Sequence, residues 1–173
     1  LTPIVIAFTV ALTACGGGND SSGVDTSALK IQTETTCGIT NFEADMLSMV
    51  NAMRSSGAVC GGVSYPPVGA LTWNNSLKDA ATLSAYDNAK TGKKSHVGTD
   101  GSNVSERAAA VGYGGGTGEN FYWGFNSVAS AISWWKDSAP HCANMMRADY
   151  QAIGASCVQG GGYSHFTQVF GTR

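Results

Sequence analysis

The sequence predicts an α+β fold, in which helices come first and an antiparallel sheet comes last. Four helical patterns precede a final pair of strand-like segments joined by a glycine-rich turn. Strands and helices do not alternate along the chain, which argues against a doubly wound parallel sheet. Because 43% of the 173 residues are hydrophobic, the chain can bury a sizeable core, and its length suits a single domain.

The first predicted helix starts in the sequence Thr40-Asn41-Phe42-Glu43, which has the form of a capping box, and Gly57 ends it. Its apolar positions recur at helical spacing and are Phe42, Met46, Met49, Val50 and Met53. A second helix begins at Asn75 or Ser76 and presents one face made of Leu77, Ala80, Ala81, Ser84, Ala85 and Asn88. Two shorter helices are expected over residues 104–111 and 127–136.

Three segments are predicted to form strands. The aromatic stretch 119–123 is bounded by glycines and rich in residues that favour strands. The end of the chain has the pattern of a hairpin, with strands over 152–158 and 163–170 and a turn over 159–162. In the last strand, two-residue alternation places Tyr163, His165, Thr167 and Val169 on one face.

The charge balance argues against nucleic acid as a partner. Ten basic and twelve acidic side chains give a net charge of -2, whereas phosphate binding draws on a basic excess or patch. No apolar run reaches the roughly 18 residues of a membrane-spanning helix.

The first residues resemble a secretion signal. Residues 1–14 are apolar and uncharged, and they lead into Leu12-Thr13-Ala14-Cys15, which resembles a bacterial lipobox. We expect cleavage before Cys15, which would then carry the lipid and provide the only contact with the membrane. Residues 15–36 would form a flexible tether, and residues 37–173 the folded domain. The protein is thus expected to be an exported, membrane-anchored lipoprotein, periplasmic or at the cell surface; the alternative is a plain signal peptide that contains a cysteine.

The remaining four cysteines, Cys37, Cys60, Cys142 and Cys157, are an even number in a chain expected to be exported, so two disulfides are predicted. Three pairings are possible. We favour Cys37–Cys60 with Cys142–Cys157, because both close short loops. A cysteine-based zinc site is not expected, since no pair has C-x-x-C spacing.

Chemistry-bearing side chains are few. The chain has three histidines, His96, His141 and His165, and each taken singly has an ordinary structural explanation. Glu119 stands at the entry to the apolar aromatic strand, where a buried carboxylate would need a partner. Asp137, just past two tryptophans, fits a surface acid at a helix end equally well.

Six segments together resemble one family. They are Met46–Arg54 with Asn-x-x-Arg, Leu71–Leu77 as L-x-W-x-x-x-L, Ser95–Ser102 as S-H-x-G-x-D-G-S, Gly118-Glu119-Asn120 as G-E-N, Trp134–Met146 near W-x-x-S-P-x-H-x-x-N-I-L, and Tyr163–Gly171 near G-H-F-T-Q-V-V-W. Each is weak alone, but their order from about Cys37 to Gly171 resembles the CAP superfamily of cysteine-rich secretory, antigen 5 and pathogenesis-related proteins.

The resemblance implies an α-β-α sandwich, with a central antiparallel sheet flanked by helices, and a cleft that holds two histidines and two acids. Position by position, the cleft members would be His96, Glu119, Asp137 and His165. Asp137 stands where many members have the longer Glu. His141 adds a third imidazole, which either replaces or supplements His165.

Such a cleft allows several chemistries. His96, His165 and His141 are candidate ligands for Zn or another divalent cation, and with Glu119 and Asp137 they are candidate catalytic groups. No G-x-S-x-G or His-Glu-x-x-His motif is present. The first hypothesis is a tethered binding domain that takes a metal, a small molecule, a lipid or a peptide. The alternatives are a metal-dependent hydrolase and an interaction module that uses loops such as 112–117.

Overall fold

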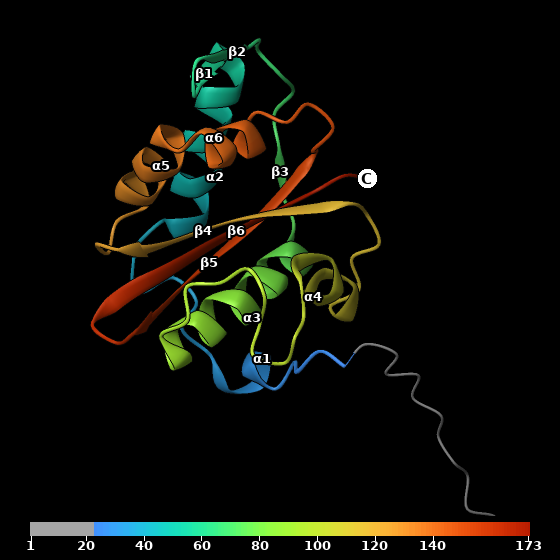
Figure 1. Cartoon of the computed structure of the whole chain (residues 1–173), viewed down its shortest axis with the longest axis vertical. Helices are drawn as coiled ribbons and strands as arrows, with labels where there is room; N and C mark the ends of the chain where they lie inside the picture. The colour runs from blue at the N-terminus through green and yellow to red at the C-terminus, as the bar shows by residue number, and fades with distance from the viewer. Residues whose placement is uncertain (1–22) are drawn as a thin grey trace, which may run out of the picture.

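The computed structural model describes residues 23–173. The signal peptide expected at residues 1–14 and the expected lipidation site Cys15 lie outside this part of the chain. One sheet lies between two layers of helices, which confirms the α-β-α sandwich (Figure 1). Among the described residues, no helix is both long enough and apolar enough to cross a bilayer.

The central sheet has four strands in the order β3-β5-β6-β4. Their bounds are Thr72–Trp73 for β3, Thr117–Gly124 for β4, Ala152–Gly160 for β5 and Tyr163–Gly171 for β6. β4, β5 and β6 are antiparallel as expected, but the two-residue β3 pairs with β5 in parallel, so the sheet is mixed. A separate pair, β1 (Ala58–Cys60) and β2 (Val63–Tyr65), follows no strand pattern in the sequence.

Six described helices cover the two faces. They are α1 (Ala28–Ile31), α2 (Phe42–Ser56), α3 (Asn75–Thr91), α4 (Val104–Ala110), α5 (Val128–Asp137) and α6 (Ala139–Met145). Figure 1 shows α2, α5 and α6 on one face of the sheet, and α1, α3 and α4 on the other. The larger part of the core lies on the α2 side, where Trp135, Phe166 and Phe170 are fully buried.

The predicted small face of α3 packs against the sheet. All six of its residues are buried, which confirms the pattern: Leu77, Ala80, Ala81, Ser84, Ala85 and Asn88. Gly154 on β5 permits the close approach, because a Cβ there would lie 2.0 Å from the backbone nitrogen of Lys78. Helix and sheet backbones therefore meet almost directly.

The start of α2 differs from the prediction. The capping box expected at Thr40–Glu43 does not form: the N-cap is Asn41, in a left-handed conformation, and its side chain makes no capping hydrogen bond. A capping box forms instead at α4, where Asn103 and Glu106 each accept a hydrogen bond from the other's backbone nitrogen. Gly57 ends α2 with a positive φ of 74°, as expected.

The favoured disulfide pairing is wrong. The bonds are Cys37–Cys157 and Cys60–Cys142, with sequence separations of 120 and 82 residues. Thr36 forms a parallel bridge with Cys157, so the chain before α2 runs beside β5. Helix α2 then carries the chain away to β1, where Cys60 packs near α6. Proximity in the fold, rather than a short loop, decides both bonds.

The last part of the expected tether packs on the domain. Ala28 in α1 is buried, and the backbone nitrogen of Asp25 donates to Asp100. The carbonyl of Thr35 accepts a hydrogen bond from the backbone nitrogen of Cys157. Packed structure therefore extends back to about Asp25, before the domain start expected at Cys37.

Candidate functional site

The site lies at the free edge of β4, the outer strand of the sheet. Side chains from the neighbouring helices bond to the backbone carbonyls of this strand. Asn144 Nδ2 donates to the carbonyl of Glu119 at 3.2 Å, and Trp135 Nε1 donates to that of Phe121 at 3.0 Å. These bonds occupy acceptors that a further strand would use, so they protect the edge of the sheet.

Glu119 is the buried centre of the site. Its side chain is 2% exposed, and both carboxylate oxygens are engaged. Oε1 lies 2.8 Å from Nδ1 of His96, and Oε2 accepts from Nη2 of Arg107 at 2.8 Å. The guanidinium of Arg107 is buried as well, so it compensates the charge of the carboxylate where water cannot.

Arg107 also fixes the loop that carries His96. It donates from Nη1 to the carbonyl of Ser102 at 2.7 Å, and from Nη2 to the carbonyl of His96 at 3.1 Å. Sequence reasoning missed this residue, although an arginine among the alanines of the predicted 104–111 helix was a usable signal.

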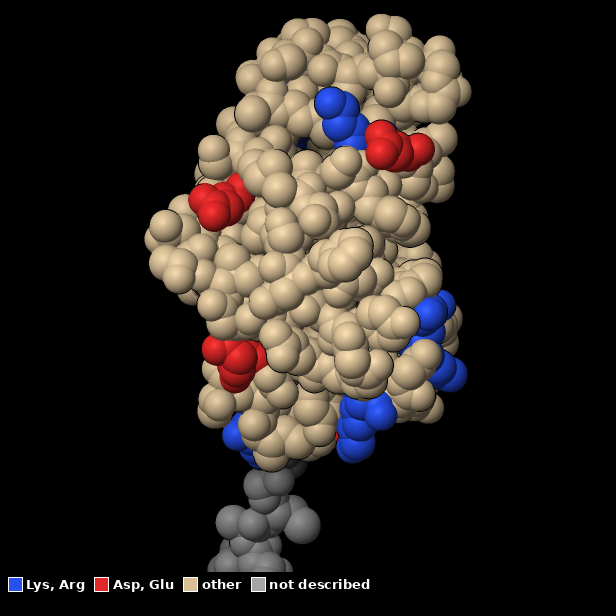
Figure 2. Space-filling view, turned by 90° about the vertical axis from the view of Figure 1, so that its left-hand side faces the viewer, with Lys and Arg blue, Asp and Glu red and all other residues tan. Residues whose placement is uncertain are grey.

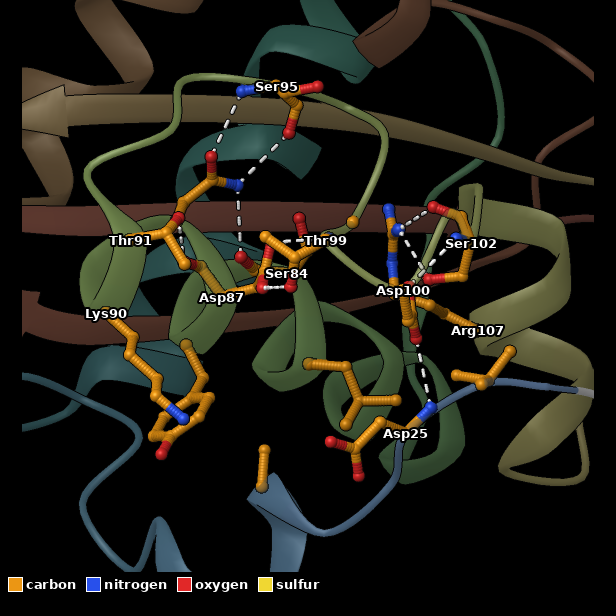
Figure 3. Close-up of a pocket in the computed structure, with 16 residues that line it drawn as sticks. Asp25, Ser84, Asp87, Lys90, Thr91, Ser95, Thr99, Asp100, Ser102 and Arg107 are labelled. Atoms are coloured by element: carbon orange, nitrogen blue, oxygen red, sulfur yellow. Dashed lines mark hydrogen bonds between the residues drawn. The ribbon is translucent and has the colours of Figure 1, made fainter.

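Helix α3 holds the same loop from the other side. The side chain of Asn88 exchanges two hydrogen bonds with the backbone of Ser95, and Asp87 accepts from the backbone nitrogen and the hydroxyl of Thr99. Figure 3 shows these bonds around a small cavity between α3, the loop and the N-terminal segment. The loop is therefore a rigid support for His96.

His96 presents a free ring nitrogen. A carboxylate oxygen can only accept, so Nδ1 carries the proton in this hydrogen bond and Nε2 of the neutral ring is an acceptor. The side chain is 51% exposed, and Nε2 has no hydrogen-bond partner among residues 23–173. The imidazole is thus oriented from behind and open to a ligand in front.

His141 is the second imidazole of the site. It lies in the first turn of α6, with Nδ1 2.8 Å from the hydroxyl of Ser138. Burial lowers the pKa of His141, and the proximity of His96 lowers it further. Burial and the nearby His96 therefore both favour the neutral form of His141, which can accept a hydrogen bond or ligate a metal.

His165 lies elsewhere on the sheet. It pairs with Trp123 across β4 and β6, four residues along from the pairing of Glu119 with Val169, which corresponds to about 13 Å. The ring is 5% exposed and donates from Nε2 to the carbonyl of Gly160 at 3.2 Å. Burial lowers its pKa; the bond to Gly160 opposes this shift, and Lys94 adds to it.

Asp137 also stands apart from Glu119. It is the exposed last residue of α5, and its side chain has no hydrogen bond or ion pair with another described residue. The structure thus brings together His96, Glu119 and His141, but not Asp137 or His165. Within residues 23–173, no group of three or more His, Cys, Asp or Glu side chains is arranged to hold a metal ion.

The family of the chain is identified by its sequence. A sequence model of the "Cysteine-rich secretory protein family" (CAP) matches residues 47–170, most of the chain. The chain belongs to the CAP family. This confirms the resemblance drawn from the six segments. No curated protein sequence matches the chain significantly.

Solved structures share the CAP fold. An extracellular protein containing an SCP domain from Bacillus anthracis has a TM-score of 0.63 and 18% identity, over 75% of this chain and 40% of the other. A cysteine-rich secretory protein from Staphylococcus aureus has a TM-score of 0.57 and 17% identity, over 75% of this chain and 38% of the other. The chain thus spans less than half of either protein. An outer surface protein from Borrelia burgdorferi has a TM-score of 0.60 and 16% identity, over 87% of this chain and 96% of the other.

In this CAP domain the glycine-rich loop 112–117 is anchored. Tyr113 Oη donates to the carbonyl of Thr172, and the backbone nitrogen of Gly116 donates to the hydroxyl of Thr172. A Cβ at Gly115 would lie 2.0 Å from the same carbonyl. Gly115 and Gly116 therefore pack closely against Thr172 at the end of the chain. The hypothesis that this loop carries recognition stays a prediction.

Proposed function

We propose that this CAP domain is an exported binding domain, tethered at Cys15, whose surface around His96 and His141 takes a small ligand or a divalent metal ion. One observation carries the proposal: the 2.8 Å bond to Glu119 orients His96 and leaves its Nε2 open on a half-exposed ring. An extracytoplasmic location is supported by two proteins of similar structure, the extracellular protein from Bacillus anthracis and the outer surface protein from Borrelia burgdorferi.

A metal would find few protein ligands here. Zn²⁺ in proteins commonly takes three or four side-chain ligands, and His96 and His141 offer two imidazole nitrogens. A carboxylate behind a ligating histidine raises its basicity, and Glu119 stands in that relation to His96. We therefore expect a weak site, in which water or a ligand supplies the remaining coordination.

Calorimetric titration with Zn²⁺ tests whether His96 and His141 bind a metal ion. We expect H96A and H141A each to weaken Zn²⁺ binding by about tenfold or more. The matched control is D137N, which changes the exposed acid that the structure leaves outside the cluster and should bind as the native protein does. Equal affinities in the native protein and H96A would remove His96 as a ligand.

One observation favours a second function. A carboxylate that orients an imidazole with a free Nε2 is the arrangement of a general base, which could activate water. A hydrolase of this kind would turn over ester or peptide substrates, and E119Q would abolish the turnover. Loss of turnover on addition of a chelator would show that a metal takes part. If neither native protein nor E119Q releases product, the binding function stands alone.

A further inference from the structure

Ring side chains connect the two imidazoles of the site. We call this set the aromatic arc: His96, Phe121, Trp123, Trp134 and His141. Successive ring centroids are 4.7, 5.5, 6.2 and 5.1 Å apart, so each ring contacts the next. Residues from a loop, a strand and two helices, far apart in the sequence, thus form one aromatic surface.

The aromatic arc is open to solvent. Trp134 is 42% exposed and His96 is exposed, while Phe121 and Trp123 are half-buried. Tyr163 and Val97 nearby are exposed as well, and Lys94 lies over the Trp123 ring at 4.4 Å. Exposed aromatic side chains that gather in one place mark a binding surface on a protein, since scattered single ones are the rule elsewhere.

The chemistry around the arc argues against an extended peptide and against a lipid tail. Asn144 and Trp135 already occupy carbonyls at the edge of β4, which disfavours a peptide strand added there. An alkyl chain needs an enclosed apolar cavity, whereas here the rings are half-open and carry polar nitrogens at both ends.

The charged side chains at the arc narrow the chemical class of the ligand further. Among residues 23–173, Glu119 is the one carboxylate bonded to a ring of the arc, and both of its oxygens are bonded to protein. The carboxylate of Glu119 is therefore not available to bind a cationic ligand, and in the described part of the chain Lys94 is the only cation over the rings of the arc. Figure 2 shows that charged side chains are sparse over the face of the molecule that it presents. An uncharged ligand with apolar faces and hydroxyl groups fits best.

We propose that the aromatic arc binds a saccharide, whose ring lies against Trp134 and Trp123 while its hydroxyl groups bond to Nε2 of His96 and of His141. This inference rests on the proposed function and names the ligand class of the same site. The C–H faces of a sugar ring pack on aromatic rings, and its hydroxyls donate to neutral imidazole nitrogens.

Two uncharged tetrasaccharides serve as probes: β-1,4-linked N-acetylglucosamine and β-1,4-linked glucose. Binding to the full chain is measured by calorimetry and tryptophan fluorescence with EDTA present, so that metal plays no part. We expect at least one tetrasaccharide to bind, and W134A to weaken binding by about tenfold. The matched control is F125A, because Phe125 is an 81% exposed aromatic residue without a ring contact to any member of the arc, so its removal should not change the affinity.

Three results would overturn the inference: no binding of either tetrasaccharide, equal losses in W134A and F125A, or displacement of the sugar by dodecanoate, which would indicate an apolar site. Titration of the native protein with Zn²⁺ and with each tetrasaccharide separates the two proposals. Binding of Zn²⁺ without binding of either sugar overturns the saccharide alone, whereas binding of neither overturns the proposed function as well.

Discussion

The carboxylate of Glu119 is almost fully removed from water, a state that is costly unless cations or donors surround it. Arg107 takes one oxygen and His96 the other. Because the second bond fixes which nitrogen of His96 is protonated, a buried ion pair sets the hydrogen-bonding character of an exposed ring. The role of Arg107 is therefore to position His96 through Glu119 and through the loop.

Removing Arg107 should expose this dependence. We expect R107M to lower the free energy of unfolding by about 3 kcal/mol, because Glu119 is left as a buried charge without its cation. Urea denaturation measures the change. The control is R147M, which breaks the exposed pair with Asp149 and should cost less than about 1 kcal/mol. Similar losses in the two variants would contradict a special role for Arg107.

His165 should make stability depend on pH. Its pKa is lowered in the folded chain, mainly by burial, and returns to its ordinary value of 6.5 on unfolding. The unfolded chain therefore binds more protons below pH 6.5, so stability falls as the pH drops through that value and levels off once the folded ring is protonated. His141, also lowered, acts in the same direction.

Thermal melting between about pH 7.5 and about pH 5 measures this effect. The melting temperature should fall with pH in the native protein and fall less in H165Q, which has no ring to protonate. The carboxylates whose pKa is lowered, such as Asp100, titrate below this window. An unchanged slope in both H165Q and H141Q would show that neither histidine is shifted.

At the scale of elements, the contact between α3 and β5 depends on the absence of a side chain. A Cβ at Gly154 would collide with the backbone at Leu77 and Lys78, which no rotamer change can relieve. We expect G154A to destabilise the fold by about 3 kcal/mol in urea denaturation. G69A is the control, since its Cβ would meet nothing within 4 Å. Equal stability of both variants would mean that α3 can shift without cost.

The longer elements were predictable because their patterns repeat over several turns or residues. The face of α3 and the hairpin of β5 and β6 follow directly from periodicity, and Gly161 and Gly162, both with positive φ, close the turn as a hairpin of this type requires. α1, β1, β2 and β3 have two to four residues each, too few for a period to register.

The pairing of side chains was harder to predict. The motifs pointed to His96 and Glu119, but the salt bridge to Arg107 depends on how α4 packs beside β4. The disulfides failed for the same reason, since short loops are only one way to bring two cysteines together. Sequence patterns specify elements, and contacts between distant elements decide the partners.

At the scale of the whole molecule, each of the two disulfides joins an early segment of the domain to a late one. Cys37–Cys157 fixes the chain before α2 to β5, and Cys60–Cys142 fixes the β1–β2 pair to α6, which carries His141. Upstream of Cys37, the segment is held by weaker contacts: the buried Ala28, and the bond from Asp25 to Asp100 in the loop that follows His96. The expected tether is therefore attached to the support of the site.

This attachment can be tested at Ala28, which packs in α1 on the α3 side of the domain. A28E should force a charge into a buried position, release the segment and lower the unfolding free energy by about 2 kcal/mol. Trypsin should then cleave after Lys30 faster than in the native protein, because local opening limits cleavage. T33E places the same charge at an exposed position close to Lys30 and should be cleaved at the native rate. If A28E and T33E are cleaved alike, α1 is not held by packing, and the folded domain begins at Cys37.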